Sequence, residues 1–304
     1  MRIVYLGTSQ FAAAVLRTLA ATPHRPALVV TRPDRPRGRG RHLAPPPVAQ
    51  TATELELELY QPSSVNEPEA RERIAAARPD AIVVCAFGAL IKEPLLSDHE
   101  VLNVHPSLLP RWRGAAPIER AIMAGDARTG VSIMRLTAGL DTGPVARTGD
   151  LPIEPDDTFG TLSDRLEALS AQLLIEVLDA GPGGVSFREQ PEEGVTYAEK
   201  ISAEDRILDP AQSAAALERR VRALTPHIGA AVLLSGHERL GVWRAHARPR
   251  AEGDPPEGEL GEAQADNGGL PVLGCAGDSV LVLDEVQPAG KRQMDAAAWL
   301  RGRR

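Results

Sequence analysis

Two polar side chains stand close together at the end of an apolar run, and both belong to residue types that can do chemistry. Asn103 and His105 are separated by a single valine. In an extended segment alternate side chains share a face, so the amide and the imidazole should project to the same side. Both can donate hydrogen bonds to an oxyanion, and the imidazole can also move protons near neutral pH. Because polar groups are costly to bury without such a task, we predict that this pair stabilises charge during catalysis.

A carboxylate follows in the segment 139–143, where glycines stand on both sides of Leu-Asp-Thr. Such a segment is typical of a turn, and it could present Asp141 to a ligand or to a partner side chain. Ser107 lies in a loop stiffened by prolines, but no serine–histidine–aspartate spacing surrounds it. We therefore interpret Ser107 as a loop residue that makes a hydrogen bond, and we predict Asn103, His105 and Asp141 as the catalytic centre.

The elements that must position these residues alternate between short apolar strands and helical patterns. Such alternation predicts a Rossmann-like α/β fold with a mostly parallel sheet covered on both faces, and ligands bind beyond the carboxyl ends of its strands. The predicted strands are 2–6, 27–31, 80–86, 101–104 and 131–136, and the predicted helices are 11–19, 48–57, 67–77, 116–123 and 158–178.

The pattern changes after residue 190. A helix is predicted over 211–224 and a closing helix over 294–300, with short β-like runs between them that have no helix in between. This arrangement is typical of a small β-barrel. We predict a catalytic domain over 1–190, a linker over 191–206 and a C-terminal barrel domain over 207–304. The five strands of the barrel are predicted at 231–234, 240–245, 258–263, 270–273 and 280–286.

The composition is that of a globular protein, with 43% hydrophobic and 25% charged residues in 304. Cys85 and Cys275 form no disulfide framework or metal-binding pair. The sequence opens on a strand-like run without a signal-peptide pattern, and no apolar stretch is long enough to span a membrane. We therefore expect a cytoplasmic protein, and monomer is the default because no symmetric interface feature stands out.

One loop departs strongly from the overall charge of −7. The segment 31–42 holds five arginines and one aspartate, so its charge is +4 and that of the rest of the chain is −11. A concentrated basic loop on an acidic protein is typical of a protein that binds a phosphate-bearing partner such as RNA. We expect its prolines and glycines to prevent regular structure.

The turn after the first predicted strand contains Gly7 as its only glycine. A dinucleotide-binding loop has the pattern Gly-x-Gly-x-x-Gly, whose further glycines let the backbone approach a pyrophosphate. We therefore interpret Gly7 as a strand-to-helix turn and do not predict a nicotinamide cofactor.

The combination of Asn-x-His, a Ser-Leu-Leu-Pro loop and Gly-Leu-Asp-Thr-Gly resembles the active centre of the folate-dependent formyltransferases. The run 107–118 (SLLPRWRGAAPI), together with 31–36, 196–200 and 287–291, is similar to the branch of this family whose acceptor is aminoacylated initiator tRNA. The resemblance covers nearly the whole chain. It implies transfer of the formyl group of 10-formyltetrahydrofolate to the α-amino group of methionine on that tRNA, which gives N-formylmethionyl-tRNA for translation initiation.

The resemblance also implies roles for individual residues. Asn103 and His105 would stabilise the oxyanion, while Asp141 would position His105 and a water for proton transfer. No metal is implied, and the C-terminal barrel would be an OB-like domain that binds tRNA. The folate contacts would be Phe87, Gly88, Ala89, Leu90, Ile91, Ser107, Leu108, Leu109 and Pro110, and the tRNA contacts would be Arg32, Arg35, Arg37, Arg39, Arg41 and Lys200.

Some positions depart from the family's pattern. Ser9-Gln10 replaces a common Pro-Asp, and Pro106 stands where glycine is common. The segment 225–230 (TPHIGA) replaces a common Asn-Pro-Trp-Pro, which leaves tRNA contacts in the second domain open.

Three alternatives remain at this point. A formyltransferase for a small amine would need neither the arginine loop nor the C-terminal barrel. A folate-dependent hydrolase would keep His105 and Asp141 but use water as the attacking group. A tRNA-binding module without activity would need none of the three predicted catalytic residues.

Overall fold

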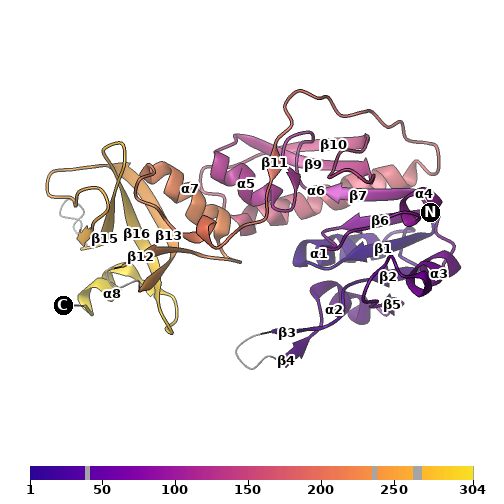
Figure 1. Cartoon of the computed structure of the whole chain (residues 1–304), viewed down its shortest axis with the longest axis horizontal. Helices are drawn as coiled ribbons and strands as arrows, with labels where there is room; N and C mark the ends of the chain where they lie inside the picture. Colours follow the sequence, from indigo (N-terminus) through magenta and orange to yellow (C-terminus); the bar gives the residue numbers. More distant parts are fainter. Residues whose placement is uncertain (38–41, 235–237, 263–268, 304) are drawn as a thin grey trace. The chain divides into compact units, whose positions relative to one another are not determined.

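The computed structural model describes residues 1–37, 42–234, 238–262 and 269–303. Its contacts divide the chain into two units, each built from three separate segments of the sequence (Figure 1). The domain boundaries at residues 190 and 206 stay predictions, because the units are interleaved along the chain. The first unit consists of Met1–Gly114, Thr129–Leu151 and Ser163–Tyr197, and the second of Ala115–Arg128, Pro152–Leu162 and Ala198–Arg304.

A seven-stranded sheet with the order β10-β9-β7-β6-β1-β2-β5 forms the centre of the first unit. The pairs β1/β2, β1/β6, β2/β5 and β6/β7 are parallel, whereas β9 runs antiparallel to β7. The predicted mostly parallel α/β sheet is therefore confirmed. The strands are β1 (Ile3–Gly7), β2 (Leu28–Val30), β5 (Leu59–Tyr60), β6 (Ala81–Cys85), β7 (Val101–His105), β9 (Arg128–Arg135) and β10 (Val145–Pro152).

The parallel strands form because their apolar side chains are buried on both faces. All five residues of β1 and of β6 are buried, and the core on one side joins Val4, Ile82 and Val101. Such continuous apolar runs are characteristic of parallel strands that helices cover on each side. The helices of this part are α1 (Gln10–Ala20), α2 (Pro47–Glu54), α3 (Pro68–Ala76), α4 (Leu95–Asp98) and α6 (Phe159–Asp179).

Gly7 ends β1 where the chain passes closely over its neighbours. A Cβ atom at this position would lie 2.9 Å from Cβ of Ala12 and 3.1 Å from the carbonyl oxygen of Cys85. Ser9 then caps α1, since its Oγ accepts a hydrogen bond from the backbone N–H of Ala12 at 3.2 Å. The glycine is therefore required by close packing at a strand-to-helix turn.

The expectation that 31–42 lacks regular structure is wrong for the part of this segment that is described. β3 (Arg35–Arg37) pairs antiparallel with β4 (His42–Ala44), and Pro36 stands opposite Leu43. A two-stranded ribbon has only edge strands, so a proline without an N–H is tolerated there.

The second unit contains the predicted antiparallel strands. β13 and β16 lie at the centre of a sheet with the order β12-β13-β16-β15-β14, and β17 pairs with β16. The register of β13 against β16 shifts near Arg244, and such a bulge bends a strand. Closure into an OB-like barrel stays a prediction. The strands are β12 (Ala230–Leu233), β13 (Arg239–Pro249), β14 (Leu260–Glu262), β15 (Pro271–Cys275), β16 (Ser279–Pro288) and β17 (Met294–Asp295).

Helices complete the core of the second unit. Leu217 and Val221 of α7 pack with Val242, Leu281 and Trp299 in one buried cluster. The helix predicted from residue 211 begins at residue 214, because Ser213 caps it by accepting a hydrogen bond from Ala216 N. The helical elements of this unit are α5 (Pro117–Ala124), the 3₁₀ turn η1 (Glu204–Arg206), α7 (Ala214–Leu224) and α8 (Ala296–Arg301). The short strands β8 (Arg113–Gly114), which belongs to the first unit, and β11 (Tyr197–Ala198) form a separate ribbon.

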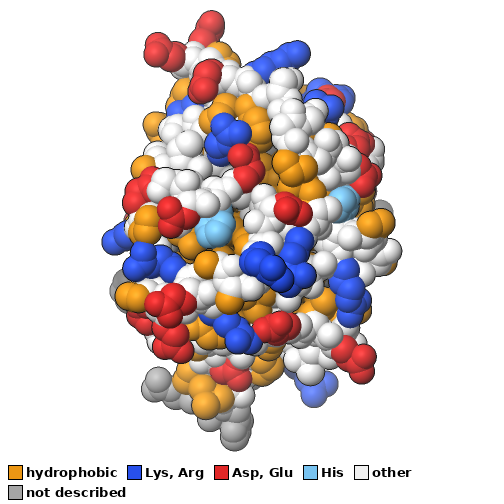
Figure 2. Space-filling model, turned by 90° about the vertical axis from the view of Figure 1, so that its right-hand side faces the viewer, with side chains coloured by type: hydrophobic (Ala, Val, Ile, Leu, Met, Phe, Trp, Pro, Cys, Tyr) orange, Lys and Arg blue, Asp and Glu red, His pale blue; other side chains and the backbone are white. Residues whose placement is uncertain are grey.

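Two observations concern the surface. In the described part of the chain, no helix is long and apolar enough to cross a membrane. Figure 2 shows one face of the molecule, on which acidic and basic side chains are interspersed without a large area of one sign. This face therefore offers no large basic area to a polyanionic partner, which would have to bind to basic groups concentrated elsewhere.

Candidate active site

Strand β7 carries Asn103 and His105 at its carboxyl end, between the parallel strand β6 and the antiparallel strand β9. The two side chains are almost fully buried, with 9% of Asn103 and 4% of His105 exposed. Since one residue separates them in a strand, they lie on the same face of the sheet, as the sequence pattern predicts.

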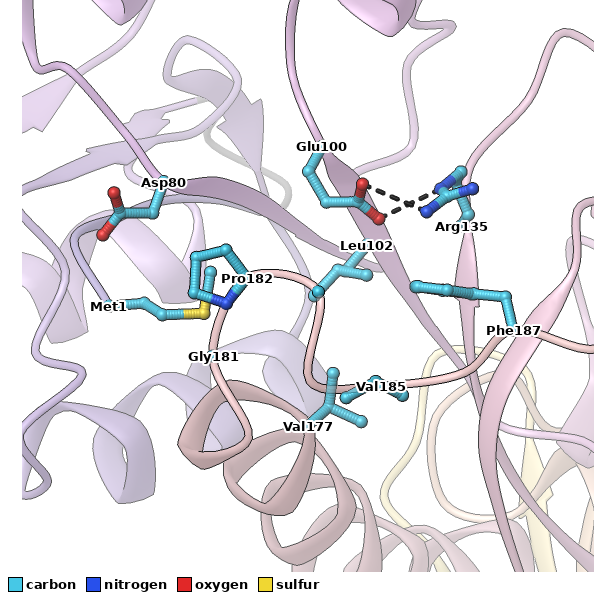
Figure 3. A pocket seen from close by; sticks show the side chains of 11 residues that line it. Met1, Asp80, Glu100, Leu102, Arg135, Val177, Gly181, Pro182, Val185 and Phe187 are labelled. Atoms are coloured by element: carbon cyan, nitrogen blue, oxygen red, sulfur yellow. Dashed lines mark hydrogen bonds and ion pairs between the residues drawn. The ribbon is translucent and has the colours of Figure 1, made fainter.

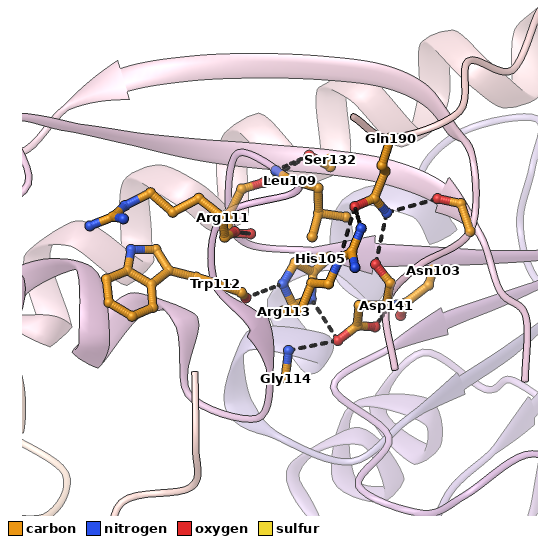
Figure 4. Close-up of polar contacts among 12 residues, drawn as sticks. Asn103, His105, Leu109, Arg111, Trp112, Arg113, Gly114, Ser132, Asp141 and Gln190 are labelled. Atoms are coloured by element: carbon orange, nitrogen blue, oxygen red, sulfur yellow. Dashed lines mark hydrogen bonds and ion pairs between the residues drawn. The ribbon is translucent and has the colours of Figure 1, made fainter. Parts of the chain in front are cut away.

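Asp141 meets both side chains from the turn between β9 and β10. Nδ2 of Asn103 donates a hydrogen bond to Oδ1 of Asp141 at 3.3 Å, and the backbone N–H of Gly114 donates to Oδ2 at 2.9 Å. Nδ1 of His105 lies 3.7 Å from the same Oδ2 atom. The three residues predicted as catalytic are therefore in one buried cluster (Figure 4).

The ring of His105 is oriented by the backbone of the loop that follows it. Its Nε2 atom lies 2.8 Å from the carbonyl oxygen of Trp112. A carbonyl oxygen can only accept a hydrogen bond, so Nε2 must carry the proton in this contact. Nδ1 is consequently the ring atom that faces the carboxylate of Asp141.

Gln190 supports this cluster and was not predicted from the sequence. Its Nε2 donates to the carbonyl oxygens of Asp141 at 2.7 Å and Gly143 at 2.8 Å. Its Oε1 accepts from Nε and Nη2 of the buried Arg113 at 3.0 and 2.7 Å. All four contacts are visible as one network in Figure 4, and they connect the Asp141 turn to the loop that touches His105.

The hydrogen bonds of Gln190 hold Asp141 in a backbone conformation that residues other than glycine adopt infrequently. Asp141 has φ of +49°, in the left-handed region where residues other than glycine are uncommon. A glutamine in an irregular segment carries no periodic pattern, so no sequence signal singles it out. Arg113 belongs to the motif that carries the family resemblance, and its position in that motif is the signal that could have been used.

Ser107 has the loop role predicted for it. Its hydroxyl donates to the carbonyl oxygen of Arg111 at 2.6 Å, and the residue is fully buried. Ser132 links the same loop to β9, because its hydroxyl donates to the carbonyl oxygen of Ser107 and accepts from the N–H of Leu109. Ser107 therefore shapes the loop, whereas Leu108, Leu109 and Pro110 are partly exposed and could meet a ligand.

The predicted folate loop after β6 contains both buried and exposed residues. Phe87 and Ile91 are 4% and 6% exposed and belong to the core cluster, whereas Gly88, Ala89 and Leu90 are exposed. Leu90 and Leu140, which precedes Asp141, are 68% and 60% exposed. Large exposed leucines in both loops provide apolar surface of the kind that a flat ring system covers.

The predicted tRNA contacts are only partly within the described residues. Arg32 donates from Nη1 to the carbonyl oxygen of Gly88 at 2.8 Å, so it supports the folate loop. Arg35 and Lys200 are exposed, and Arg37 belongs to β3. Arg39 and Arg41 lie outside the residues that the structure describes.

A separate cavity of about 240 Å³ lies near the amino ends of β6 and β7 (Figure 3). Asp80 and Glu100, which line it, directly precede β6 and β7, whereas His105 ends β7. Glu100 is already paired with Arg135, at 3.0 Å between Oε1 and Nε. This cavity therefore does not belong to the predicted catalytic centre.

Among the residues that the structure describes, no group of three or more His, Cys, Asp or Glu side chains is placed to hold a metal ion.

Comparison with known proteins places this geometry in a family. Residues 1–178 match the formyl transferase family, and residues 200–304 match its formyl transferase C-terminal domain. The methionyl-tRNA formyltransferase of Thiobacillus denitrificans is 45% identical over 100% of this chain and 97% of its own length. That of Methylococcus capsulatus is 45% identical over 99% of this chain and 96% of its own.

Solved structures share the fold at lower identity. The N-formyltransferase of Helicobacter canadensis, in complex with folinic acid and dTDP-3-aminofucose, has a TM-score of 0.67 and 12% identity over 93% of this chain and 98% of its own. HypX of Aquifex aeolicus, in complex with tetrahydrofolic acid, has a TM-score of 0.64 and 18% identity over 99% of this chain and 47% of its own. With two matching family domains and full-length relatives at this identity, the chain belongs to the methionyl-tRNA formyltransferase family of formyl-transferring enzymes.

Proposed function

We propose that this enzyme transfers the formyl group of 10-formyltetrahydrofolate to the α-amino group of initiator methionyl-tRNA. The observation that carries the proposal is the convergence of Asn103, His105 and Asp141 in one buried cluster. The cluster contains hydrogen-bond donors and a carboxylate, and the hydroxyl of the neighbouring Ser107 is held by the loop backbone. Such a set suits direct attack by the substrate's own amine, without a covalent enzyme intermediate.

The amine of an aminoacyl group can attack without a strong base, since an α-amino group has a pKa of about 8. The attack forms a bond between this nitrogen and the formyl carbon and places negative charge on the formyl oxygen. One N–H of the Asn103 carboxamide is directed to Asp141, which leaves its second N–H for this oxyanion. A well-placed donor of this kind contributes about 3–4 kcal/mol to catalysis.

Completion of the reaction breaks the bond between the formyl carbon and the folate nitrogen. The attacking amine loses one proton, and the departing nitrogen gains one, so the protons balance. His105 Nδ1 and Asp141 Oδ2 lie 3.7 Å apart, so a water in contact with both atoms would carry this proton to the departing nitrogen. Asp141 also keeps the imidazole in its orientation.

The donor would lie along the loop after β6 and the turn that carries Asp141. Exposed Leu90 and Leu140 offer apolar contact, and the backbone of Gly88, with φ of +71°, is open to a ligand. Leu108, Leu109 and Pro110 would complete the donor contacts. The residues present therefore fit a flat, partly apolar pterin.

The acceptor RNA would be held by the basic segment 31–42. This segment is +4 on a chain of −7, so it concentrates positive charge where the protein otherwise has little. Within it we assign RNA contact to Arg35, Arg37, Arg39 and Arg41, with Arg32 fixing the base of the segment and Lys200 as a further contact. The C-terminal domain, over 207–304, would supply a second RNA surface.

We further propose that the enzyme acts in the cytoplasm and is a monomer. An acceptor screen with one formyl donor tests the function. Initiator methionyl-tRNA should be formylated far faster than elongator methionyl-tRNA, free methionine or small sugar amines. Preference for a small amine would replace the proposed acceptor, and release of formate without transfer would indicate a hydrolase.

A further inference from the structure

The side chain of Arg32 connects the start of the basic segment to the folate loop, residues 87–91 after β6. Its Nη1 donates a hydrogen bond to the carbonyl oxygen of Gly88 at 2.8 Å. Gly88 has φ of +71°, and the two residues that follow it, Ala89 and Leu90, are exposed. A hydrogen bond to a backbone carbonyl restrains the path of the chain itself. Arg32 therefore helps to set the position of the surface that we assign to the folate donor.

The backbone around Arg32 is anchored as well, by Gln61, which directly follows β5. Its Nε2 donates to the carbonyl oxygen of Arg32 at 3.0 Å and to Oδ1 of Asp34 at 2.8 Å. The N–H of Thr31 also donates to the carbonyl oxygen of Tyr60, the last residue of β5, at 3.1 Å. This end of the basic segment is therefore fixed to the edge of the central sheet, and Arg32 extends that connection to the folate loop.

The β3–β4 ribbon begins immediately beyond these anchored residues. Figure 1 shows it projecting past α2 and β5, away from the central sheet. A ribbon of two strands is only marginally stable unless it packs against other elements. Packing is slight here, because Leu43 of β4 is 70% exposed and Arg35 and Pro36 of β3 are exposed as well. The ribbon would therefore gain order when a partner binds to it.

We propose that Arg32 is a positioning residue that couples the two substrate sites, so that the folate donor binds more tightly when RNA occupies the β3–β4 ribbon. The inference rests on the proposed function, which assigns folate to the loop after β6 and RNA to the basic segment. RNA bound at Arg35 restrains the backbone of Arg32, whose guanidinium passes this restraint to Gly88. The first ligand meets the conformational-entropy cost of ordering this connection, so the second binds a site that is already ordered.

Binding of folinic acid tests this coupling, because its formyl group is on another folate nitrogen and no turnover occurs. Titration calorimetry gives its Kd for the enzyme alone and for the enzyme saturated with uncharged initiator tRNA. In wild type, tRNA should lower this Kd by about 5-fold or more, which is the lower end of ordinary coupling between two sites. Folinic acid must then strengthen tRNA binding by the same factor, which provides an internal check.

Two variants break the connection at different points. Arg32→Met keeps an unbranched side chain but removes the donor to Gly88, so the ratio of the two Kd values should lie within about twofold of one. The lost charge affects tRNA binding equally with and without folinic acid and does not alter the ratio. Gln61→Leu changes no charge and should also reduce the ratio, since it frees the backbone of Arg32. If Arg32→Met no longer binds folinic acid, a wild-type ratio in Gln61→Leu would overturn the proposal.

Asn66→Ala is the matched control, because Asn66 holds the same folate loop at another point. Its Nδ2 donates to the carbonyl oxygen of Leu90 at 2.8 Å, and its Oδ1 accepts from the N–H of Lys92 at 2.9 Å. Its remaining hydrogen bonds within the described part of the chain are to Ser64, outside the basic segment. The variant should bind folinic acid more weakly but keep the wild-type ratio. Loss of the ratio here would overturn the assignment to Arg32.

The wild-type measurements separate this inference from the proposed function. Equal Kd values with and without tRNA, or weaker binding of folinic acid in its presence, would overturn the coupling and leave the function intact. Failure of wild type to bind folinic acid or initiator tRNA at all would instead refute the proposed function on which the coupling rests.

Discussion

Nδ1 of His105 lies 3.7 Å from Oδ2 of Asp141, which is close enough for an ion pair but too long for a hydrogen bond. The other contacts of both residues are short. His105 is bound to the Trp112 carbonyl at 2.8 Å, and Asp141 is bound by Gly114 N–H at 2.9 Å. The gap is therefore set by the backbone of residues 112–114, which holds each of the two side chains at a short distance.

Replacement of His105 tests its part in proton transfer. His105→Ala removes the imidazole that takes part in proton transfer beside Asp141, so kcat should fall by about 10²–10⁴-fold. The protein should stay folded, with circular dichroism spectra like those of wild type. Single-turnover formylation with saturating donor and acceptor measures the effect, and a rate within tenfold of wild type would remove His105 from the mechanism.

Gln190 should matter for rate although it lies behind the catalytic residues. Gln190→Glu keeps an acceptor for Arg113 but cannot donate to the carbonyl oxygens of Asp141 and Gly143. The Asp141 turn should then shift, so we expect kcat to fall by about 10-fold or more while KM for the acceptor changes little. Steady-state kinetics over a range of pH measure this, since the added charge beside Asp141 should also move the pH profile.

Glu189→Gln is the control for that experiment. Glu189 is exposed and adjacent to Gln190 in sequence. Glu189→Gln replaces a carboxylate with an amide, which is the reverse of the exchange in Gln190→Glu. It should behave as wild type. An equal decrease in both variants would show that the segment, and not the amide of Gln190, is responsible.

The sequence reveals the parts of this site that follow from strand periodicity. Continuous apolar runs identify β1 and β6, because both faces of a parallel strand are buried. Asn103 and His105 can be identified from the sequence because burying polar side chains at the end of such a strand costs free energy unless they serve a function. The convergence of Asp141 with them was predicted as well, from a turn and a family resemblance.

Other features were hidden for physical reasons. β10 reads Val-Ala-Arg-Thr-Gly-Asp-Leu-Pro, and most of its residues are exposed or partly exposed, as suits an edge strand that carries little apolar pattern. The β3–β4 ribbon contains Pro36, which argues against a strand in any central position. Gln190 acts through backbone carbonyls that only the folded chain brings together, so no local pattern could reveal it.

The basic segment can be tested through the salt dependence of acceptor binding. Each arginine that contacts a phosphate releases counterions, so its removal lowers the slope of log KM against log salt concentration by about 1. We expect this for Arg39→Gln, with no change in KM for the folate donor. Arg17→Gln is the control, because Arg17 pairs with Glu54 at 3.2 Å on neighbouring helices. A slope identical to wild type in Arg39→Gln would exclude Arg39 as a phosphate contact.

Glu167 of α6 should make the stability of the protein depend on pH. Burial raises the pKa of this carboxyl from 4.5 to about 7, although Ser163 donates a hydrogen bond to it at 3.1 Å. A raised pKa means that the folded protein binds the proton more tightly than the unfolded chain. The associated stability is complete below pH 4.5 and is lost as pH rises through about 7.

Glu167→Gln replaces the carboxyl with a neutral group of the same shape, so this loss should disappear. Relative to wild type, the variant should gain about 1 kcal/mol more at pH 8.5 than at pH 5, a modest value because the side chain is only partly buried. Urea unfolding at both pH values measures the difference. Glu176→Gln, an exposed position on the same helix, should show no such change. If the difference between Glu167→Gln and wild type is the same at both pH values, Glu167 is ionised in the folded protein throughout this range, and its burial does not control the stability.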